Sequence, residues 1–427
     1  MFEPLVLIVS VYLAGLALGL PVFFVVAAIM VVYAIAFPVM PPVVVGQLLT
    51  QGLDRGALVA VPAFMLAGAL MNAGGMTDRL VRVALALTGP FRGGLAHANI
   101  GASILFGGIS GSAAADVAAV GSVMVPAMAR EGYPPAYAAA VTASSATIGL
   151  LIPPSLSMVF FGLFNNAPVD ALFVAGVVPG LLMGVYLLVV SAMIARRRGY
   201  PSTPFTGWRE LAAGLRQSVL ALLMPVAVIV AMSKGLATVN EVASLSAVYA
   251  LLVSMFVYRT LSLRELWPVV RQAAIDSARL LSILAAAGGI PWILANLGAS
   301  EAMSESIAAI GLSQTALLGL VALLLVLIGT MVGPGVQILL IAPAISPVMV
   351  GAGIDIVHFG VVCVLASAIG LVTPPVGFLL FLTSTQARVG VLAVVRESLP
   401  FTAALLALLA SLVAFPSLSL GLGRWLS

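Results

Sequence analysis

The chain has 427 residues, of which 62% are hydrophobic and 7% charged, and its mean hydropathy is +1.23. Because soluble proteins carry roughly 25% charged residues, this composition excludes a soluble enzyme or binding domain. It predicts an all-helical, multi-pass membrane protein with on the order of ten to thirteen spans. The single cysteine and two histidines leave too few ligands for a metal cluster, so we expect no cofactor and no enzyme activity.

The net charge of +4 comes from basic residues that lie between apolar runs, which indicates membrane orientation rather than nucleic-acid binding. The chain begins with an apolar segment that carries Glu3 and has no basic region, which favours a first membrane helix over a cleaved signal peptide. In chain order the apolar runs are 5–18, 21–37, 57–74, 97–128, 136–165, 171–195, 217–233, 242–258, 279–297, 313–350, 356–386 and 399–420.

Short arginine-rich segments predict which ends of the runs face the cytoplasm. These segments are 79–92, 196–216, 259–271 and 388–396. With them inside, run 97–128 lies between Arg92 and Arg130 and should enter and leave on the cytoplasmic side. It is too short and too rich in glycine for two full crossings, so we expect a re-entrant helical hairpin.

Run 313–350 has the opposite flanks. Glu301, Glu305 and Asp355 surround it, and no Lys or Arg occurs between Arg279 and Arg388. The same rule predicts that this run enters and leaves on the side away from the cytoplasm, as a second re-entrant hairpin.

Glycine and proline residues recur at a constant separation of 221 positions, without gaps. The pairs are Gly108 with Gly329, Pro126 with Pro347, Gly132 with Gly353, Gly149 with Gly370, and Pro153-Pro154 with Pro374-Pro375. Since the charges place the two hairpins on opposite sides, the repeats are predicted to be inverted. Inverted repeats with broken helices that meet near the midplane are the architecture of secondary transporters.

These features predict five regions. They are 1–56 with N-terminal scaffold helices, 57–170 with the first repeat (hairpin 97–128, broken helix 136–165), 171–278 with scaffold helices and cytoplasmic loops, 279–390 with the second, inverted repeat (hairpin 313–350, broken helix 356–386), and 391–427 with a C-terminal scaffold helix.

Two stretches of the chain carry a family resemblance. They are FGGISGSAAADVAAVGSVMVPAMAREGYPPAYAAAVTASSATIGLLIPPSLSMVFFG, from Phe106 to Gly162, and GPGVQILLIAPAISPVMVGAGIDIVHFGVVCVLASAIGLVTPPVGFLLF, from Gly333 to Phe381. They resemble the large membrane subunit of the tripartite ATP-independent periplasmic (TRAP) transporters. The resemblance implies an elevator-type, sodium-driven importer of an organic acid in the bacterial inner membrane. It also implies two partners: a periplasmic substrate-binding protein and a small four-helix membrane subunit, here expected as a separate polypeptide.

The candidate sodium or substrate sites follow from residue chemistry. Small residues let a helix break and free carbonyls, and carbonyls with hydroxyls are hard oxygen ligands that suit sodium better than proton relay. For the first repeat the candidates are Gly108, Ser110, Gly111, Ser112, Ser144, Ser145, Thr147, Gly149, Pro153 and Pro154. For the second they are Gly329, Thr330, Gly333, Gly335, Ser367, Gly370, Thr373 and Pro374. The alternative is that these small residues merely allow tight helix packing.

Asp116 follows the first tip inside an otherwise uncharged run, so a role in shaping the tip is expected, with helix capping as the alternative. No Arg or Lys occurs in the hairpins or in the segments expected to face them. Helix N-termini, hydroxyls and bound sodium would therefore supply the positive potential for an anionic substrate.

Two other functions compete with this prediction. A sodium–dicarboxylate carrier of related elevator fold would work without a binding protein. An intramembrane enzyme would need clustered acid, histidine or lysine side chains at membrane depth, and the sequence has no such cluster.

Overall fold

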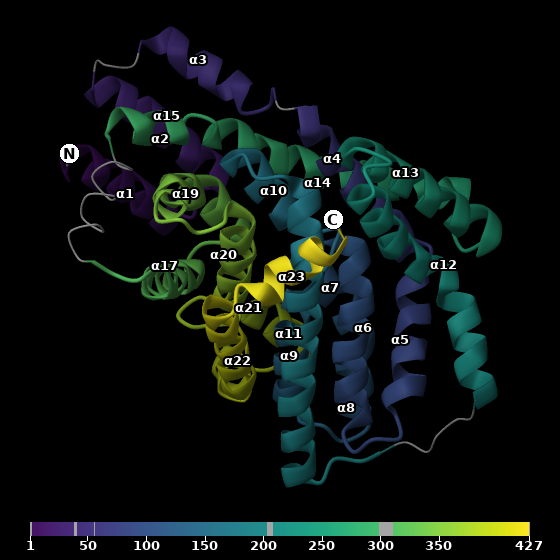
Figure 1. Cartoon of the computed structure of the whole chain (residues 1–427). Coiled ribbons are helices and arrows are strands. Elements are labelled where there is room, and N and C mark those ends of the chain that lie inside the picture. Colours follow the sequence, from purple (N-terminus) through teal and green to yellow (C-terminus); the bar gives the residue numbers. More distant parts are fainter. Residues whose placement is uncertain (1, 38–40, 55, 203–207, 299–310, 427) are drawn as a thin grey trace.

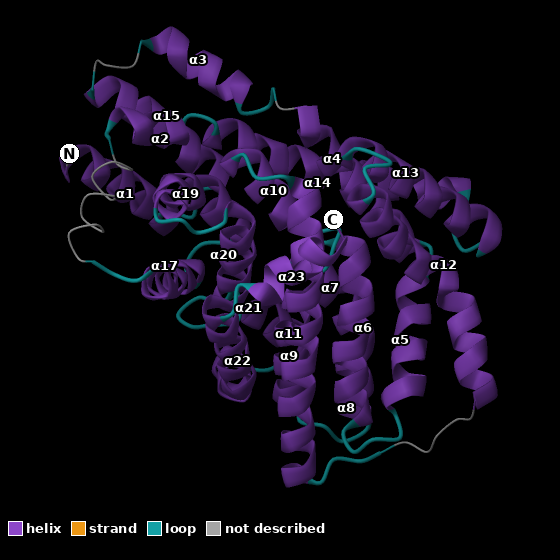
Figure 2. Cartoon of the chain, viewed as in Figure 1, coloured by secondary structure: helices purple, strands orange, loops and turns teal. Residues whose placement is uncertain are grey.

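The computed structural model of the chain describes residues 2–37, 41–54, 56–202, 208–298 and 311–426, and every element in these ranges is helical (Figures 1 and 2). The flanking residues Glu301 and Glu305 lie outside the described residues. Within these described ranges, seven helices are long and apolar enough to cross a membrane, or eight if one bent pair counts as a span. This is fewer than ten to thirteen because breaks divide other apolar runs into helices of 10–17 residues.

The N-terminal part consists of α1 (Phe2–Ala17), α2 (Val22–Ala36), α3 (Pro42–Gln51), α4 (Ala60–Ala73) and α5 (Met76–Thr88). α4 and α5 meet at an angle of 68°. Gly75 lies between them with φ +67°, a backbone conformation that side chains with a Cβ rarely adopt. The glycine therefore permits the sharp bend that turns α5 away from α4.

Run 97–128 folds back on itself. It contains α6 (Gly94–Ser110), α7 (Ala113–Asp116), a π-helical segment (Val117–Gly121) and α8 (Ser122–Arg130). Near the open end, Asn99 Nδ2 lies 3.8 Å from Met128 Sδ, and nearer the tip Ser103 Oγ lies 2.9 Å from Asp116 Oδ1. The two arms are thus antiparallel, and both ends of the run lie at the same end of the molecule (Figure 1).

Run 313–350 has the same form, with α17 (Gln314–Gly329), α18 (Pro334–Val336), a π-helical segment (Gln337–Ile341) and α19 (Ala342–Gly351). At its open end Gln314 Nε2 donates to the Ala352 carbonyl at 2.9 Å. Nearer the tip, Gln337 Nε2 donates to the Leu325 carbonyl at 2.9 Å. These two bonds join the arms at both ends.

Each hairpin is followed by two helices separated by a break. These are α9 (Pro135–Ala146) and α10 (Leu156–Asn165) after the first hairpin, and α20 (Ile356–Gly370) and α21 (Phe378–Ala387) after the second. The peptide bonds Pro153-Pro154 and Pro374-Pro375, one in each break, are both cis.

The remaining helices are α11 (Val169–Arg198), α12 (Trp208–Ser233), α13 (Val239–Leu252), α14 (Leu263–Ala287), α15 (Ile290–Asn296), α22 (Val391–Ala414) and α23 (Ser417–Leu426). The arginine-rich segment 259–271, which falls in the region expected to hold cytoplasmic loops, is helical over most of its length, because α14 begins at Leu263. Ser262 and Glu265 form a capping box there, with the Ser262 side chain accepting from the Glu265 N–H.

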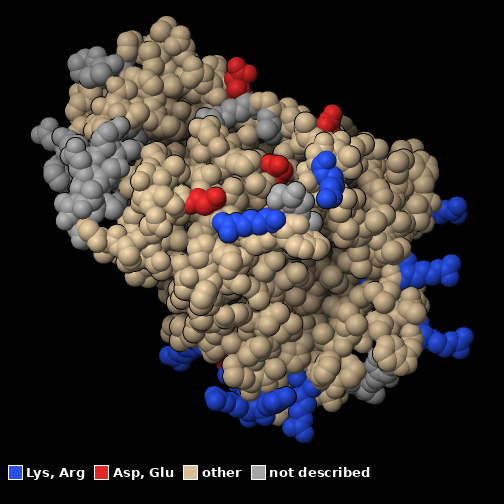
Figure 3. Space-filling model, in the orientation of Figure 1, with Lys and Arg blue, Asp and Glu red and all other residues tan. Residues whose placement is uncertain are grey.

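The helices form two packing groups that α5 and α12 connect. α4 packs against α13 and α14, whereas α11 packs against α6, α20, α22 and α23, and α9 packs against α21 and α22. α5 packs against α6 and α12, and α12 also contacts α11 and α13. An ion pair of 2.8 Å joins Arg198 at the end of α11 to Glu397 of α22. Most of the Lys and Arg side chains visible in Figure 3 lie at the lower end and right-hand edge of the view, whereas Asp and Glu lie mainly above them.

Candidate functional site

The tip of the first hairpin turns at Gly111. This residue has φ +59°, and a Cβ added to it would lie 2.5 Å from the carbonyl oxygen of Pro154. Only glycine fits both the turn and the close approach. Ser112 then caps α7, because its side chain accepts a hydrogen bond from the Ala115 N–H at 3.4 Å.

The first break begins where α9 ends. The Thr147 hydroxyl donates to the Ser144 carbonyl at 2.5 Å, and Ser155 caps α10 by accepting from the Met158 N–H at 3.3 Å. These side chains satisfy backbone groups that the break would otherwise leave buried and unpaired.

Glycines bring the first hairpin and the first break into backbone contact. A Cβ added to Gly107 would lie 2.9 Å from the Gly149 Cα. Gly108, the predicted site residue, instead faces α12, where its added Cβ would lie 3.0 Å from the Pro225 Cβ. Tight packing thus accounts for Gly149, with Gly107 rather than Gly108 as its partner.

Asp116 is completely buried and does not cap a helix, so the capping alternative is wrong; Ser112 occupies that position. The Asp116 carboxylate accepts from Ser103 of α6, whose Oγ also lies 3.0 Å from Ser145 Oγ of α9. The second carboxylate oxygen, Oδ2, and the Ser144 Oγ have no hydrogen-bond partner among the described residues. Asp116 therefore links the returning arm of the hairpin to α6 and, through Ser103, to α9.

The second hairpin and its break repeat the backbone contact. A Cβ added to Gly370 would lie 2.5 Å from the carbonyl oxygen of Gly329 and 2.6 Å from its Cα. The hydroxyls of Thr330, Ser367 and Thr373 donate within their own helices or turns, at 2.6–2.8 Å. These hydroxyls can still accept, but backbone oxygens must supply much of any ion site in this half.

A cavity of about 270 Å³ lies where the two tips meet. Gly111 and Ser112 of the first tip and Gly333 and Gly335 of the second contribute to its wall, together with Ser157 of α10. Ser112 and Gly333, which precede α7 and α18 in the same way, are 221 positions apart. The structure thus brings the two predicted tips to one cavity.

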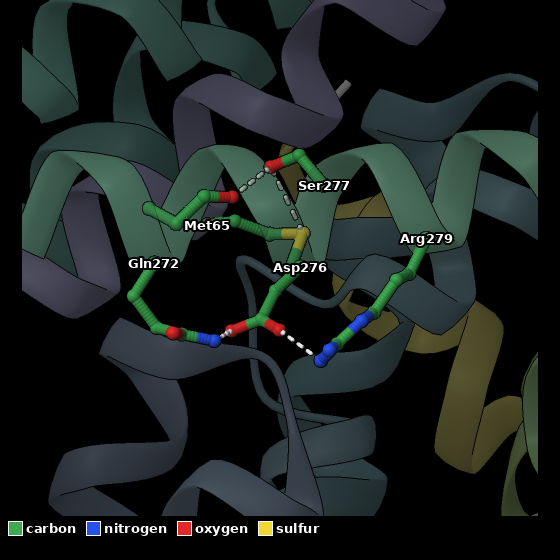
Figure 4. Close-up of polar contacts among 6 residues, drawn as sticks. Met65, Gln272, Asp276, Ser277 and Arg279 are labelled. Atoms are coloured by element: carbon green, nitrogen blue, oxygen red, sulfur yellow. Dashed lines mark hydrogen bonds and ion pairs between the residues drawn. The ribbon is translucent and has the colours of Figure 1, made fainter.

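A second cavity of about 650 Å³ adjoins the first and shares residues with it, among them Ser112 and Leu280. α4, the first tip and α14 form its wall, and α14 contributes the polar side chains of Gln272, Asp276 and Arg279 (Figure 4). The hairpins' inner segments and the broken helices that face them contain no Lys or Arg, as predicted. α14, a helix outside them, nevertheless brings Arg279 to the cavity wall beside the first tip.

Not all predicted residues line these cavities. Those that line neither are Gly108, Ser144, Ser145, Thr147, Gly149, Pro153, Pro154, Gly329, Thr330, Ser367, Gly370, Thr373 and Pro374. Sequence reasoning missed Ser157 and Arg279. The capping box at Ser262 and Glu265 was the available signal for Arg279, since it predicts a helix that carries this arginine alongside the hairpin.

The arrangement suits binding rather than bond-making chemistry. Among the described residues no group of three His, Cys, Asp or Glu side chains is placed to hold a metal ion. The polar groups around the two tips are mainly hydroxyls, amides and backbone groups, with one carboxylate and one guanidinium on α14. Such groups coordinate ions and orient a small ligand without changing its covalent structure.

Comparison with known proteins identifies the family. The model of the "Tripartite ATP-independent periplasmic transporter, DctM component" family matches residues 9–418. The chain belongs to this family. The DctM family is the TRAP large subunit family that the two sequence stretches predicted, so the predicted family and the class of transporter component rather than enzyme are confirmed.

Two relatives illustrate the similarity of this DctM-family chain to curated proteins. It is 38% identical over 373 residues to the C4-dicarboxylate TRAP transporter large permease protein DctM of Pseudomonas aeruginosa, covering 87% of each chain. It is 36% identical over 374 residues to the sialic acid TRAP transporter large permease protein SiaM of Vibrio cholerae, covering 88% of each chain.

Among solved structures, the crystal structure of the Alcanivorax borkumensis YdaH transporter, described as having an unusual topology, matches with a TM-score of 0.64. The match covers 90% of this chain and 89% of that chain at 15% sequence identity, and it shows similarity of fold.

Proposed function

We propose that this chain is the large membrane subunit of a sodium-driven importer of small organic acids. The observation that carries the proposal is the cavity of about 270 Å³ whose wall contains both hairpin tips. Together with the adjoining cavity of about 650 Å³ it offers the space of a small-molecule site, and such sites in proteins enclose roughly 300–1,000 Å³. The names of the relatives, which refer to C4-dicarboxylates and sialic acid, support an organic acid as cargo.

We assign the two hairpins and two broken helices to inverted repeats. Support comes from features that recur 221 positions apart: the cis proline pairs, the capping positions Ser112 and Gly333, and the buried polar residues Asp116 and Gln337. Chance placement of glycine and proline does not account for two buried polar side chains at the same point of each returning arm.

Sodium is the proposed coupling ion, with one site between tip and break in each repeat. In the first repeat the unpartnered oxygens Asp116 Oδ2 and Ser144 Oγ are available as ligands. Oxygen ligands suit a small hard cation, and an unpaired buried carboxylate oxygen is costly unless a cation or proton compensates it. In the second repeat Gln337 Oε1 is likewise buried and unpartnered.

Transport is proposed to occur by an elevator motion. The packing favours a moving unit made of the hairpins, the broken helices, and α5, α11 and α22, which contact them closely. This differs from the scaffold role expected for 171–195 and 391–427. The scaffold is then formed by α4, α12, α13 and α14 with α1, α2 and α3, and the small membrane subunit is proposed to bind there.

The protein is proposed to reside in the bacterial inner membrane and to receive its cargo from a periplasmic binding protein. The distribution of charge in Figure 3, with most basic side chains at the lower end and right-hand edge and the acidic ones mainly above them, supports a fixed orientation in the membrane.

The test is uptake of succinate and of N-acetylneuraminate by proteoliposomes that contain the chain with its small subunit and binding protein, taken from neighbouring reading frames. We expect uptake to need a sodium gradient. Ser112→Ala and Thr147→Ala should raise the sodium concentration for half-maximal uptake.

Ser122→Ala is the matched control, because its hydroxyl donates to the Ala119 carbonyl at 2.8 Å on the same hairpin but belongs to α8, outside both the tip and the break. An unchanged sodium requirement in both site variants would remove the sodium assignment. Full uptake without the binding protein would instead support the two-component carrier.

A further inference from the structure

α14 presents one polar face to the larger cavity. The residues of this helix in the cavity wall are spaced by one, three or four positions, so they share one side of the helix, and they are Gln272, Ala273, Asp276, Arg279, Leu280 and Ile283. Figure 4 shows Gln272, Asp276 and Arg279 projecting in the same direction from this helix. The opposite wall contains Ser110 and Ser112 of the first tip.

The Arg279 guanidinium on this face forms a weak ion pair with Asp276 of the same helix. Arg279 Nη1 lies 3.1 Å from Asp276 Oδ1, and Gln272 Nε2 donates to Asp276 Oδ2 at 3.0 Å. The side chains are 73% exposed for Arg279 and 40% exposed for Asp276. A solvated pair of this kind contributes at most about 1 kcal/mol, so a competing anion can replace the Asp276 carboxylate at little cost.

A guanidinium is well suited to such an exchange. It carries five N–H donors in a planar arrangement, and this structure uses Nη1 for Asp276. Two parallel donors of the group match the two oxygens of a carboxylate, which gives directional recognition that an ammonium lacks. Among the residues that line the two cavities, Arg279 is the sole Lys or Arg.

The position of Arg279 connects it to the tips. Leu280, the next residue of α14, lines both cavities, as do Ser112 and Ile283. An anion held at Arg279 therefore lies in a cavity that adjoins the junction of the two hairpin tips, with hydroxyls on the facing wall.

We propose that Arg279 binds the carboxylate group of the cargo. Asp276 forms an ion pair with the Arg279 guanidinium until the carboxylate of the cargo displaces it. The inference rests on the proposed function for its identification of the cargo as an organic acid. It adds a specific residue, on a helix outside both hairpins and both broken helices, and a chemical class of ligand, a carboxylate.

The first test measures the potential at the cavity without requiring transport. Cys363, the single native cysteine, is fully buried, so a cysteine introduced at Ala118, on the tip side of the same cavity, gives a selective reporter. In the full chain in detergent we compare its labelling rates with an anionic and a cationic methanethiosulfonate reagent. Arg279→Gln should lower the ratio of anionic to cationic rates by about fivefold, because the two reagents respond to one charge with opposite sign.

Arg264→Gln is the matched control. It removes the same charge from the same helix, but 15 residues away, which is about 22 Å along the helix axis and beyond two Debye lengths at physiological salt. Its labelling ratio should equal that of the parent. An unchanged ratio in Arg279→Gln, or an equal change in both variants, would overturn the proposal.

The second test asks whether carboxylates occupy the site. Succinate, N-acetylneuraminate and pyruvate are each added in excess to the Ala118→Cys protein, with chloride at the same ionic strength as reference. At least one acid should slow labelling, Arg279→Gln should abolish that protection, and Asp276→Asn should give it at a lower acid concentration. Protection by none of the acids, or protection that survives in Arg279→Gln, contradicts the carboxylate site.

Failure of the Arg279 assignment can be distinguished from failure of the proposed transport function. If proteoliposomes show no sodium-driven uptake but Arg279-dependent protection persists, the anion site stands and the transport mechanism falls. If uptake is sodium-driven but Arg279→Gln leaves both protection and the cargo concentration for half-maximal uptake unchanged, the assignment of Arg279 is wrong.

Discussion

Substitution of Gly370 by alanine tests the backbone contact between the second hairpin and its broken helix. The added Cβ would lie 2.5 Å from the Gly329 carbonyl oxygen and 2.6 Å from the Gly329 Cα, which is closer than real Cβ atoms approach. Because both obstacles are backbone atoms, no side chain can rotate to relieve the overlap. α17 and α20 must separate, and overpacking of this kind costs about 1–3 kcal/mol.

Alanine substitutions at two further glycines, Gly329 and Gly319, allow the expected losses of stability to be ranked. In Gly329→Ala the nearest atom, at 2.8 Å, is the end of the Gln337 side chain, which can move, so the loss of stability should be smaller. Gly319 lies on the same helix as Gly329, but its added Cβ would meet Val413 at an ordinary 3.6 Å. Gly319→Ala should be neutral or stabilising by up to about 1 kcal/mol, the usual difference between the two residues inside a helix.

The assay is thermal unfolding of the full chain in one detergent, followed by tryptophan fluorescence. We expect the midpoint to fall by a few degrees in Gly370→Ala, less in Gly329→Ala, and not at all in Gly319→Ala. A midpoint for Gly370→Ala equal to that of Gly319→Ala would refute the reasoning, because the two backbones would then not be in contact.

Three other predictions address the first half of the chain and its packing. Ser103→Ala should lower stability by about 1–3 kcal/mol, measured by the same unfolding assay, since it leaves the buried Asp116 carboxylate without its hydroxyl donor. Cysteines placed at Arg92 and Arg130 should react with an impermeant thiol reagent from one and the same side of the membrane; labelling from opposite sides is incompatible with a re-entrant hairpin. Glu397→Gln, which removes the partly buried ion pair with the end of α11, should lower stability by about 1 kcal/mol or less, and by more at low salt than at high salt.

The sequence predicts the broad architecture because membrane insertion imposes strong local rules. Twenty-residue apolar runs, arginine placement and helix-breaking glycine and proline residues are all visible without coordinates. They locate both tips, so Ser112 and Gly333 could be named in advance as candidate site residues, one in each repeat. The family could be named because the stretches around these tips are unusually specific.

What the sequence did not reveal depends on how a helix faces its neighbours. Gly107 and Gly108 are the same residue type at adjacent positions, so the sequence cannot tell which of them faces which neighbour. The rotation of α6 about its axis places Gly107 against Gly149 and Gly108 against Pro225. The apolar pattern makes Arg279 the first residue of the run 279–297, so the sequence does not predict its position within a longer helix that faces the cavity. The Asp116 partner, Ser103, lies 13 positions earlier on the opposite arm, beyond the reach of local pattern reasoning.

The absence of side chains where Gly107 meets Gly149 and Gly329 meets Gly370 has a mechanical consequence. Side chains act as compliant spacers between helices, and two backbones in direct contact have no such slack. Each tip is thus clamped to its broken helix, and neither can swing open by itself as a gate. In the proposed elevator motion, access to the space between the tips would then change by displacement of each tip together with its broken helix past the wall that α4 and α14 provide.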